Sequence, residues 1–280
     1  MENYKIEHLV ATLNCDDMEL DKKLKIETDA IIANQNEKNE YWEKKTGKYK
    51  IRFISTDTRG VGKNRNIGLI YSNADICILS DDDMRYKDGY IDVIKGAFEK
   101  LPDADVIIFN IETIGDRDGV SNRRINKKIK KINFLNFMNY GAARLAFKLD
   151  SIKKNNIYFS TMFGGGARYS SGEDTLFLAE CLRKKLKIYT YPQNIASVRQ
   201  ESSTWFNGFN EKFFFDKGAL LSQIHPKMKY FYALFYFPIR FKSNLNFMQR
   251  QYFLCEGIKN YSKGKSFMVW QKESKYYKEK

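Results

Sequence analysis

Three consecutive carboxylates, Asp81, Asp82 and Asp83, follow the short apolar run Ile76–Leu79. Such a run is typical of a buried parallel strand, and ligands of open α/β sheets bind outside the carboxyl ends of the strands. Adjacent carboxylates repel one another, so a fold that brings them together needs a cation, and carboxylate oxygens favour Mg²⁺ or Mn²⁺. The triplet therefore predicts a divalent metal site, and the alternative is a solvated acidic turn.

A basic, glycine-rich segment, residues 58–68, precedes this strand. Its glycines can open a helix whose free backbone N–H groups face a phosphate, and Lys63 and Arg65 would add positive charge. It is not a Walker A loop, because Asn64 follows Lys63 where that motif has Ser or Thr. It is not a dinucleotide-binding fingerprint either, because Arg65 takes the place of the third glycine. The alternative is a tight turn before an exposed helix.

A second acidic site follows the glycines Gly164, Gly165 and Gly166. Ser171 and Asp174 have the spacing of a capping box, which gives Glu173 and Asp174 a structural explanation at a helix start. The glycines would let a bulky ligand approach the backbone beside a carboxylate that can take a proton from a hydroxyl. Two acidic sites joined by a basic loop predict transfer from a nucleotide diphosphate donor to a hydroxyl acceptor.

Short apolar runs alternate with helical patterns in the first half of the chain, which predicts βαβ units and a mostly parallel sheet. We expect an α/β domain over residues 1–220 and a helical, aromatic and basic segment over residues 221–280. The predicted strands are Leu9–Leu13, Ala30–Ala33, Ile51–Ile54, Ile76–Leu79 and Val106–Phe109, and the predicted helices cover residues 17–28, 64–72 and 176–185.

The composition narrows the class of protein. A chain of 280 residues with 43% hydrophobic residues can bury a sizeable core. The net charge of +14 indicates an anionic partner, which is a nucleic acid, a nucleotide-activated substrate or an acidic membrane surface. The four cysteines fit no zinc spacing, and we expect reduced thiols in the cytoplasm. No secretory signal and no apolar run long enough to span a membrane are seen.

Two further segments have patterns of their own. In residues 121–132, three isoleucines recur at helical spacing among basic residues, which predicts a helix with a solvated or an anion-binding face. The aromatic run Tyr230–Ile239 lies between basic residues. It suits an anionic membrane interface, and the alternative is a buried helix that closes the acceptor site. We expect His8 and His225 to be structural or surface residues.

These motifs together resemble family 2 glycosyltransferases of the GT-A fold, of the kind found in bacterial capsule and surface polysaccharide clusters. The resemblance runs from about Val10 to about Lys217. It rests on a helix with Arg65 and Asn66 before the acidic triplet, on Gly172-Glu173-Asp174-Thr175, and on Glu201-Ser202-Ser203-Thr204-Trp205. It implies a Rossmann-like nucleotide-sugar-binding domain and a helical C-terminal segment.

The resemblance also implies roles for single residues. The acidic triplet matches the DxD element, with Asp83 as the direct metal ligand, and Asp174 matches the general base of inverting members, with Glu173 shaping the acceptor site. The second strand ends in Asn34 and Gln35, where family members commonly have an acidic pair that recognises the nucleobase. The identity of the nucleobase in the donor is therefore left open. The implied donor-binding residues are Asn34, Gln35, Asp57, Lys63, Arg65, Asn66, Asp81 and Asp82; the acceptor-binding residues are Gly164, Gly165, Gly166 and Trp205; and the metal ligands are Asp83, Asp81 and Glu201. The alternatives to Glu201 are a water molecule or no third ligand.

The function implied is transfer of a sugar, with inversion and with Mn²⁺ or Mg²⁺, from a UDP-sugar or similar donor to a glycan or a lipid-linked glycan in surface polysaccharide synthesis. The enzyme would be cytoplasmic or peripheral on the inner face of the cell membrane. One alternative is a nucleotidyltransferase with two metal ions. Another is a basic nucleic-acid-binding module, favoured by the net charge and residues 123–131. Since no known binding motif is present, nucleic acid is not the expected partner.

Overall fold

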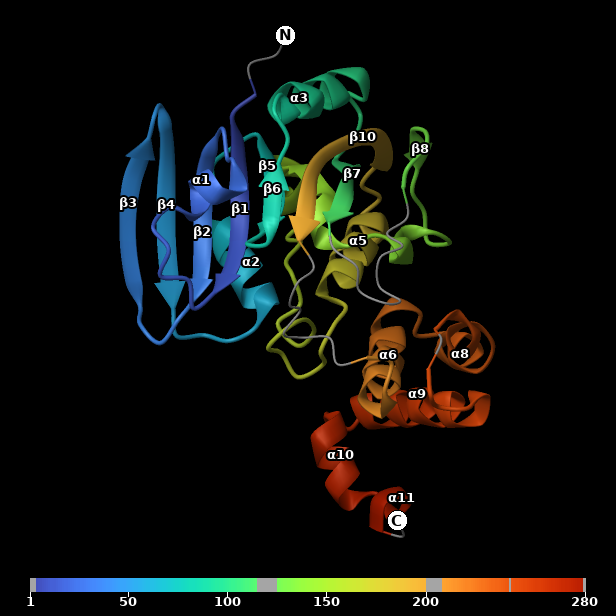
Figure 1. Cartoon of the computed structure of the whole chain (residues 1–280). Coiled ribbons are helices and arrows are strands. Elements are labelled where there is room, and N and C mark those ends of the chain that lie inside the picture. The colour runs from blue at the N-terminus through green and yellow to red at the C-terminus, as the bar shows by residue number, and fades with distance from the viewer. Residues whose placement is uncertain (1–3, 115–124, 200–207, 242, 279–280) are drawn as a thin grey trace.

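The computed structural model describes residues 4–114, 125–199, 208–241 and 243–278. Within these ranges ten strands form one sheet in the order β3-β4-β2-β1-β5-β9-β7-β10-β6, and β8 pairs with β10 (Figure 1). Five strands contain the five predicted ones, which confirms a mostly parallel α/β sheet: β1 (Ile6–Leu13), β2 (Asp29–Gln35), β4 (Tyr49–Thr56), β5 (Ile76–Asp81) and β7 (Val106–Ile114).

The sheet also contains strands that the sequence did not predict. β10 (Ile188–Arg199) runs parallel to β7, with register shifts near Pro192, a residue that has no N–H to donate. Four further strands pair antiparallel to their neighbours. They are β3 (Glu40–Thr46) at one edge, β9 (Leu145–Lys148) between β5 and β7, and the short β6 (Met84–Tyr86) and β8 (Lys130–Lys131) beside β10.

Helices cover both faces of the sheet, because successive strand residues point to opposite sides. Leu9 and Leu79 belong to one buried cluster, and their neighbours Val10 and Ile78 belong to the other. The first cluster packs under α2 (Val61–Tyr71), α4 (Leu149–Lys154) and α5 (Glu173–Arg183), and the second under α1 (Leu20–Leu24) and α3 (Tyr90–Lys100). No described helix is both long and apolar enough to cross a membrane.

The C-terminal region is helical, as expected, and packs below the sheet through α6 (Figure 1). A Cβ at Gly218 would lie 2.0 Å from the carbonyl oxygen of Leu254, and one at Gly257 would lie 1.9 Å from that of Phe215, so α6 and α9 cross at backbone contact. The predicted boundary at residue 220 falls inside α6, and the division into two units stays a prediction. The helices are α6 (Glu211–Ile224), α7 (Lys229–Phe231), the π-helical turn η3 (Tyr232–Tyr236), α8 (Phe237–Arg240), α9 (Phe247–Tyr261), α10 (Phe267–Glu273) and α11 (Lys275–Lys278).

The helix predicted over residues 121–132 is wrong for its described part, residues 125–132. No helix forms there, and Lys130 and Lys131 instead join the sheet, where the N–H of Lys130 donates to the Thr190 hydroxyl at 3.0 Å. Asn126 is buried and exchanges hydrogen bonds with Asn110, and its amide also donates to the carbonyl of Ile108. These bonds to the sheet outweigh the helical spacing of the isoleucines.

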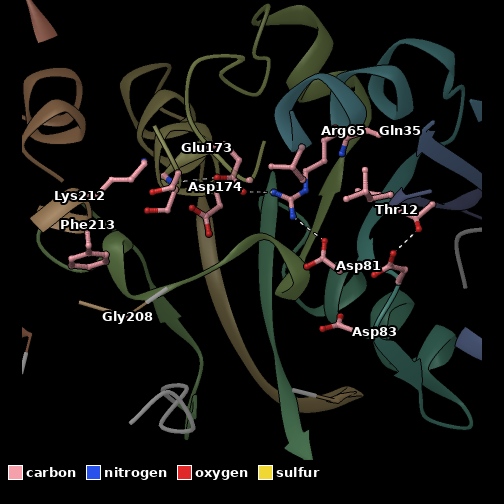
Figure 2. Close-up of a pocket in the computed structure, with 18 of the residues that line it drawn as sticks. Thr12, Gln35, Arg65, Asp81, Asp83, Glu173, Asp174, Gly208, Lys212 and Phe213 are labelled. Atoms are coloured by element: carbon pink, nitrogen blue, oxygen red, sulfur yellow. Dashed lines mark hydrogen bonds and ion pairs between the residues drawn. The ribbon is translucent and has the colours of Figure 1, made fainter. Parts of the chain in front are cut away.

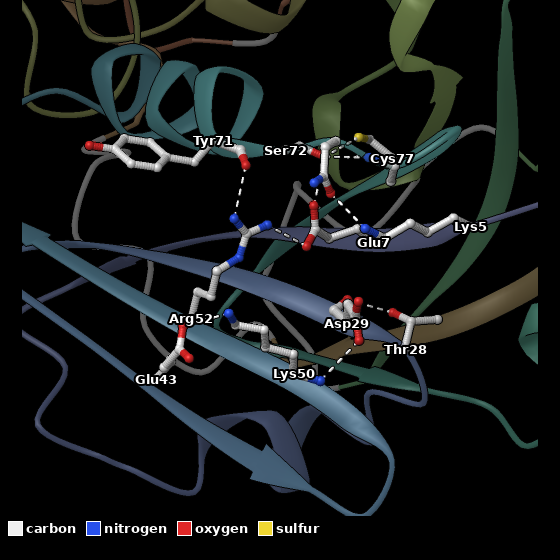
Figure 3. Close-up of polar contacts among 12 residues, drawn as sticks. Lys5, Glu7, Thr28, Asp29, Glu43, Lys50, Arg52, Tyr71, Ser72 and Cys77 are labelled. Carbon is white, nitrogen blue, oxygen red and sulfur yellow. Dashed lines mark hydrogen bonds and ion pairs between the residues drawn. The ribbon is translucent and has the colours of Figure 1, made fainter.

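A buried polar network holds the C-terminal end of α2 (Figure 3). Glu7 on β1 is buried, forms an ion pair with Arg52 on β4 at 2.6 Å, and accepts the hydroxyl of Ser72 at 2.7 Å. Arg52 also donates to the carbonyl of Tyr71, and Lys153 donates to that of Ser72. Cations at a helix C-terminus stabilise its dipole. The network therefore fixes the position of α2, which contributes Arg65 to the pocket.

Candidate active site

A pocket of about 570 Å³ lies at the carboxyl ends of β1, β2 and β5, and it extends to the start of α6 (Figure 2). It contains both acidic motifs, although 90 residues separate them in the chain. Five carboxylates from two distant parts of the chain therefore line one pocket. Its lining residues are Ala11, Thr12, Leu13, Gln35, Val61, Arg65, Asp81, Asp82, Asp83, Gly165, Ser170, Ser171, Gly172, Glu173, Asp174, Gly208, Asn210, Lys212 and Phe213.

Arg65 joins the two acidic motifs. Its Nη2 lies 2.9 Å from Oδ1 of Asp81, and its Nη1 lies 2.8 Å from Oε1 of Glu173 (Figure 2). Burial opposes the charge of the guanidinium, but the two carboxylates outweigh it and raise the pKa of Arg65. The side chain is buried and also lies over the ring of Phe159. Arg65 is therefore a fixed cation inside the pocket wall, and it holds both acids in place.

Glu173 is the more deeply buried acid of its motif. Burial and the neighbouring charge of Asp174 raise its pKa, while Arg65 acts in the opposite direction. Its second oxygen accepts the N–H of Gly172 at 3.2 Å. Gly164 packs against the same carboxylate, since a Cβ there would lie 2.8 Å from Oε2 of Glu173 and 2.6 Å from Val61, at a φ of +110°. This explains the glycine, because only glycine adopts such a backbone conformation without strain.

Asp174 lies beside Glu173 and is half-buried at the pocket surface. Its Oδ1 accepts the backbone N–H of Thr175 at 2.6 Å. The capping box predicted from Ser171 and Asp174 is wrong, because α5 begins after Gly172 and no side chain caps it. The structural explanation of this acid is therefore weaker than the sequence indicated, and its other oxygen lies near Gly141, 3.3 Å from an ideal Cβ there.

The acidic triplet forms the turn from β5 to β6. Asp81 binds Arg65, Asp82 accepts the hydroxyl of Thr12 at 2.5 Å, and the exposed Asp83 accepts the N–H of Arg199 with its carbonyl at 3.1 Å. In the described part of the chain no three His, Cys, Asp or Glu residues are grouped as metal ligands, and Glu201 lies outside it. The carboxylates fit Mg²⁺ or Mn²⁺ as one or two ligands, an arrangement that substrate phosphates complete.

The other predicted donor-binding residues lie in different surroundings. Gln35 lines the pocket, and its amide oxygen accepts the N–H of Gly60 at 2.6 Å. The amide of Asn34 is buried and bonds to both backbone groups of Cys15, and that of Asn66 bonds to both backbone groups of Phe159. Asp57 and Lys63 are exposed and are not among the residues that line the pocket.

The predicted acceptor residues lie mostly near the pocket. Gly165 lines it and accepts the N–H of Val61 with its carbonyl at 2.9 Å. Gly164 packs against the carboxylate of Glu173. Gly166 has a φ of +77°, a conformation that favours glycine. Trp205 lies outside the described residues.

Sequence reasoning missed the contribution of α6. Lys212 and Phe213 line the end of the pocket, and Lys212 pairs with the buried Asp216. Asp216 also accepts the N–H and the hydroxyl of Ser170 at 2.9 and 2.6 Å. Burial lowers the pKa of Lys217, although Asp174 and Glu173 act to raise it. No motif marks these residues; the only signal is Asn210, a good N-cap residue, ahead of an apolar pattern.

The comparisons with known proteins agree with this geometry. The sequence model of the family described as glycosyl transferase family 2 matches residues 27–167. No curated protein matches the sequence significantly. Among solved structures, residues 1–349 of TarS from S. aureus in complex with UDP-GlcNAc match with a TM-score of 0.57 and 14% identity, over 97% of this chain and 76% of that chain. The same protein in complex with UDP matches with a TM-score of 0.55 and 14% identity, over 96% and 75%. The shared fold and the family match, which covers half of the chain, together identify it as a GT-A glycosyltransferase that belongs to glycosyl transferase family 2.

Proposed function

We propose that the enzyme transfers a sugar, with inversion, from a nucleotide diphosphate donor such as a UDP-sugar to a hydroxyl of a glycan or lipid-linked glycan in surface polysaccharide synthesis. The observation that carries the proposal is the single pocket that holds the acidic triplet and Asp174 on two sides of Arg65. The similar TarS structures contain UDP-GlcNAc and UDP, which favours a uridine nucleotide.

The donor would lie over the triplet. Asp83 and Asp81 would hold Mn²⁺ or Mg²⁺, which supplies charge neutralisation for the departing diphosphate. Thr12 and Gln35 line the same end of the pocket, where their side chains can orient the nucleoside. Arg65 would hold Asp81 in place there through their ion pair of 2.9 Å.

The acceptor would enter from the side of α6, past Lys212 and Phe213. Asp174 takes the proton of the acceptor hydroxyl, the hydroxyl oxygen forms a bond to the anomeric carbon, and the bond from that carbon to the diphosphate oxygen breaks. The electron pair leaves with the nucleotide diphosphate, and attack from the opposite face inverts the configuration. Glu173 is already paired with Arg65, which leaves Asp174 as the base and Glu173 as the residue that shapes the site.

We also propose that the enzyme is peripheral on an anionic membrane surface. In the run Tyr230–Ile239 the side chains of Phe231, Phe235 and Ile239 are exposed, whereas Phe237 is buried. Exposed aromatic residues between basic ones suit a membrane interface. Replacing Phe231 and Phe235 by Ser should lower co-sedimentation with anionic vesicles without loss of circular dichroism, whereas Phe237 contributes to folding and is not a suitable site for this test.

Product identification tests the proposed reaction. A panel of nucleotide sugars is incubated with the parent, with Mn²⁺ and with glycan acceptors, and the phosphorylated product is identified by mass spectrometry. Release of a nucleoside diphosphate together with a glycan enlarged by one sugar is the expected result. In a parallel incubation with nucleoside triphosphates and sugar phosphates, release of pyrophosphate would instead indicate a nucleotidyltransferase. Absence of nucleoside diphosphate and of enlarged glycan with every nucleotide sugar would contradict the proposal.

A further inference from the structure

Two long segments of the chain contain no acidic residue. Residues 119–149 and residues 217–255 have neither Asp nor Glu, although the chain has 34 acidic residues. The first segment has Lys127, Lys128, Lys130 and Lys131, all exposed, and the second has the basic residues that flank the aromatic run. Each segment alone would be attracted to an anionic surface.

The two segments meet in the folded chain. Arg240 donates to the side-chain oxygen of Asn139 at 2.9 Å and to the hydroxyl of Tyr236 at 2.6 Å. A groove of about 410 Å³ lies between them, lined by Asn139, Phe235, Tyr236, Ile239 and Arg240. Both hydrogen bonds of Arg240 go to neutral oxygens, so its charge remains available to an anion such as a lipid phosphate.

Large apolar side chains are exposed on both sides of the groove. Leu135 is 84% exposed in the loop that follows β8, and Ile239 is 73% exposed on α8. The loop is tied to η3 by ring contacts, in which Phe137 lies 6.3 Å from His225 and His225 stacks on Tyr232 at 4.4 Å. Figure 1 shows β8 and α8 on the same side of the molecule. Apolar residues that protrude beside basic ones, in two segments that themselves contain no acid, match an anionic lipid bilayer in both charge and polarity.

This surface continues into the acceptor end of the pocket. Gly141 follows the groove residue Asn139 by two positions, and an ideal Cβ there would lie 3.3 Å from Asp174. On the other side of the groove, the ring of Phe241 lies 5.0 Å from that of Phe213, which lines the pocket. A bilayer on the groove would therefore lie next to the candidate base.

We propose that residues 127–139 and 228–240 form one bilayer-binding face, which holds the acceptor end of the pocket at an anionic membrane. This inference rests on the proposed membrane association of the aromatic run, and it adds a second segment and an orientation of the active site. The occupant is the phospholipid surface itself, from which a lipid-linked acceptor would reach Asp174.

Quenching by brominated lipids tests the position of the loop. The variant Leu135→Trp is mixed with phosphatidylglycerol vesicles that contain brominated acyl chains, and Tyr158→Trp, an exposed position outside both segments, is the control. We expect the fluorescence of the Leu135→Trp variant to be quenched well beyond that of the control. If the Leu135→Trp variant sediments with the vesicles but its tryptophan at position 135 is not quenched, the proposal is overturned.

Charge removal tests the lysines in the same face. Replacing Lys127, Lys128, Lys130 and Lys131 by Gln should weaken vesicle binding about tenfold or more, since each basic residue near an anionic surface contributes appreciably. The control replaces four exposed lysines outside both segments and has the same net charge: Lys38, Lys45, Lys48 and Lys100. Equal vesicle binding by the two variants would contradict the proposed bilayer-binding face. Binding of RNA by the parent without binding to anionic vesicles would contradict it as well.

Calorimetry with UDP and Mn²⁺ separates this inference from the proposed function. UDP binding that is retained in all these variants, with vesicle binding lost only in the face variants, supports both proposals. If the parent binds UDP but does not bind vesicles, only the proposed bilayer-binding face is rejected. Vesicle binding without UDP binding would reject the uridine nucleotide donor and leave the bilayer-binding face supported.

Discussion

Arg65 and Glu173 form a buried ion pair of 2.8 Å that joins residues 108 positions apart in the chain. The same guanidinium binds Asp81, so a single side chain from α2 connects the end of β5 with the start of α5. The acidic triplet and the acids at the start of α5 are therefore parts of one electrostatic unit, and a change at Arg65 should affect both.

Removal of Arg65 should be strongly destabilising. The variant Arg65→Met leaves Glu173 buried without its cation, and breaking a buried pair in this way costs about 3–5 kcal/mol in the free energy of unfolding. Urea denaturation measures this value. The double variant Arg65→Met/Glu173→Gln removes the uncompensated charge and should recover part of the loss; equal stability of the single and double variants would contradict the account.

The single variant Arg65→Met should also respond to pH in a defined direction. Without Arg65 the pKa of Glu173 in the folded protein lies further above its ordinary value of 4.5, which it has when unfolded. Protons are then bound more tightly by the folded state, so the contribution of Glu173 to stability is largest at acidic pH and falls as the pH rises from about 4.5 towards neutrality. The double variant with Gln at position 173 is the control and should lack this dependence.

Asp174→Asn should separate catalysis from folding. Because this acid does not cap α5, its replacement should change the free energy of unfolding by less than about 1 kcal/mol, whereas loss of a general base lowers the rate about 10²–10⁴-fold. The rate of sugar transfer and a denaturation curve on the same sample measure both effects. Transfer within a few-fold of the parent rate would show that Asp174 is not the base.

Gly164→Ala should damage the site through sterics alone. The added methyl group would meet Glu173 and Val61 at a positive φ, so we expect a loss of about 1–3 kcal/mol in stability together with loss of activity. Gly96→Ala is a matched control, since no atom lies within 4 Å of its ideal Cβ and alanine favours the helix α3 by about 0.5–1 kcal/mol. Similar melting temperatures for the two variants would contradict the predicted contact.

His8 should contribute to acid sensitivity. It is buried between Ser80 and Tyr90, at 2.7 and 2.9 Å, and burial lowers its pKa to about 3. Between pH 6.5 and 3 the unfolded chain binds this proton and the folded chain does not, so stability falls as the pH decreases, by an amount on the order of 5 kcal/mol. The difference in unfolding free energy between the parent and His8→Gln should therefore narrow on acidification; a constant difference would contradict this.

The sequence predicted the parts of the fold that have a local pattern. The apolar runs that became β1, β2, β4, β5 and β7 are buried on both faces, so their composition alone marks them. The edge strand β3 is largely exposed and rich in charge, and β9 owes its place to pairing with strands distant in the chain, so neither had a local signal. The basic segment 125–132 shows the opposite error, in which the helical spacing was overruled by hydrogen bonds that Asn126 donates to Ile108 and Lys130 donates to Thr190.

The candidate site was predicted where motifs carry it and missed where only the fold creates it. The structure brings Asp81, Asp82, Asp83, Glu173 and Asp174 into one pocket, as the motifs indicated. The exchange of hydrogen bonds between Asn66 and Phe159 has no signal in a single sequence, nor has the approach of Lys212 and Phe213 to the acids, because both depend on how distant elements pack.

Metal-dependent binding of the donor nucleotide tests the central claim most directly. Titration calorimetry with UDP would be carried out on the parent and on Asp83→Asn, each with and without Mn²⁺. Because a divalent ion would join the triplet to the diphosphate, the parent should bind UDP more tightly with Mn²⁺, and most of that gain should be absent in Asp83→Asn. Equal affinity of the two proteins for UDP at saturating Mn²⁺ would contradict the metal role of the triplet, and absence of UDP binding by the parent under every condition would contradict the proposal of a uridine nucleotide donor.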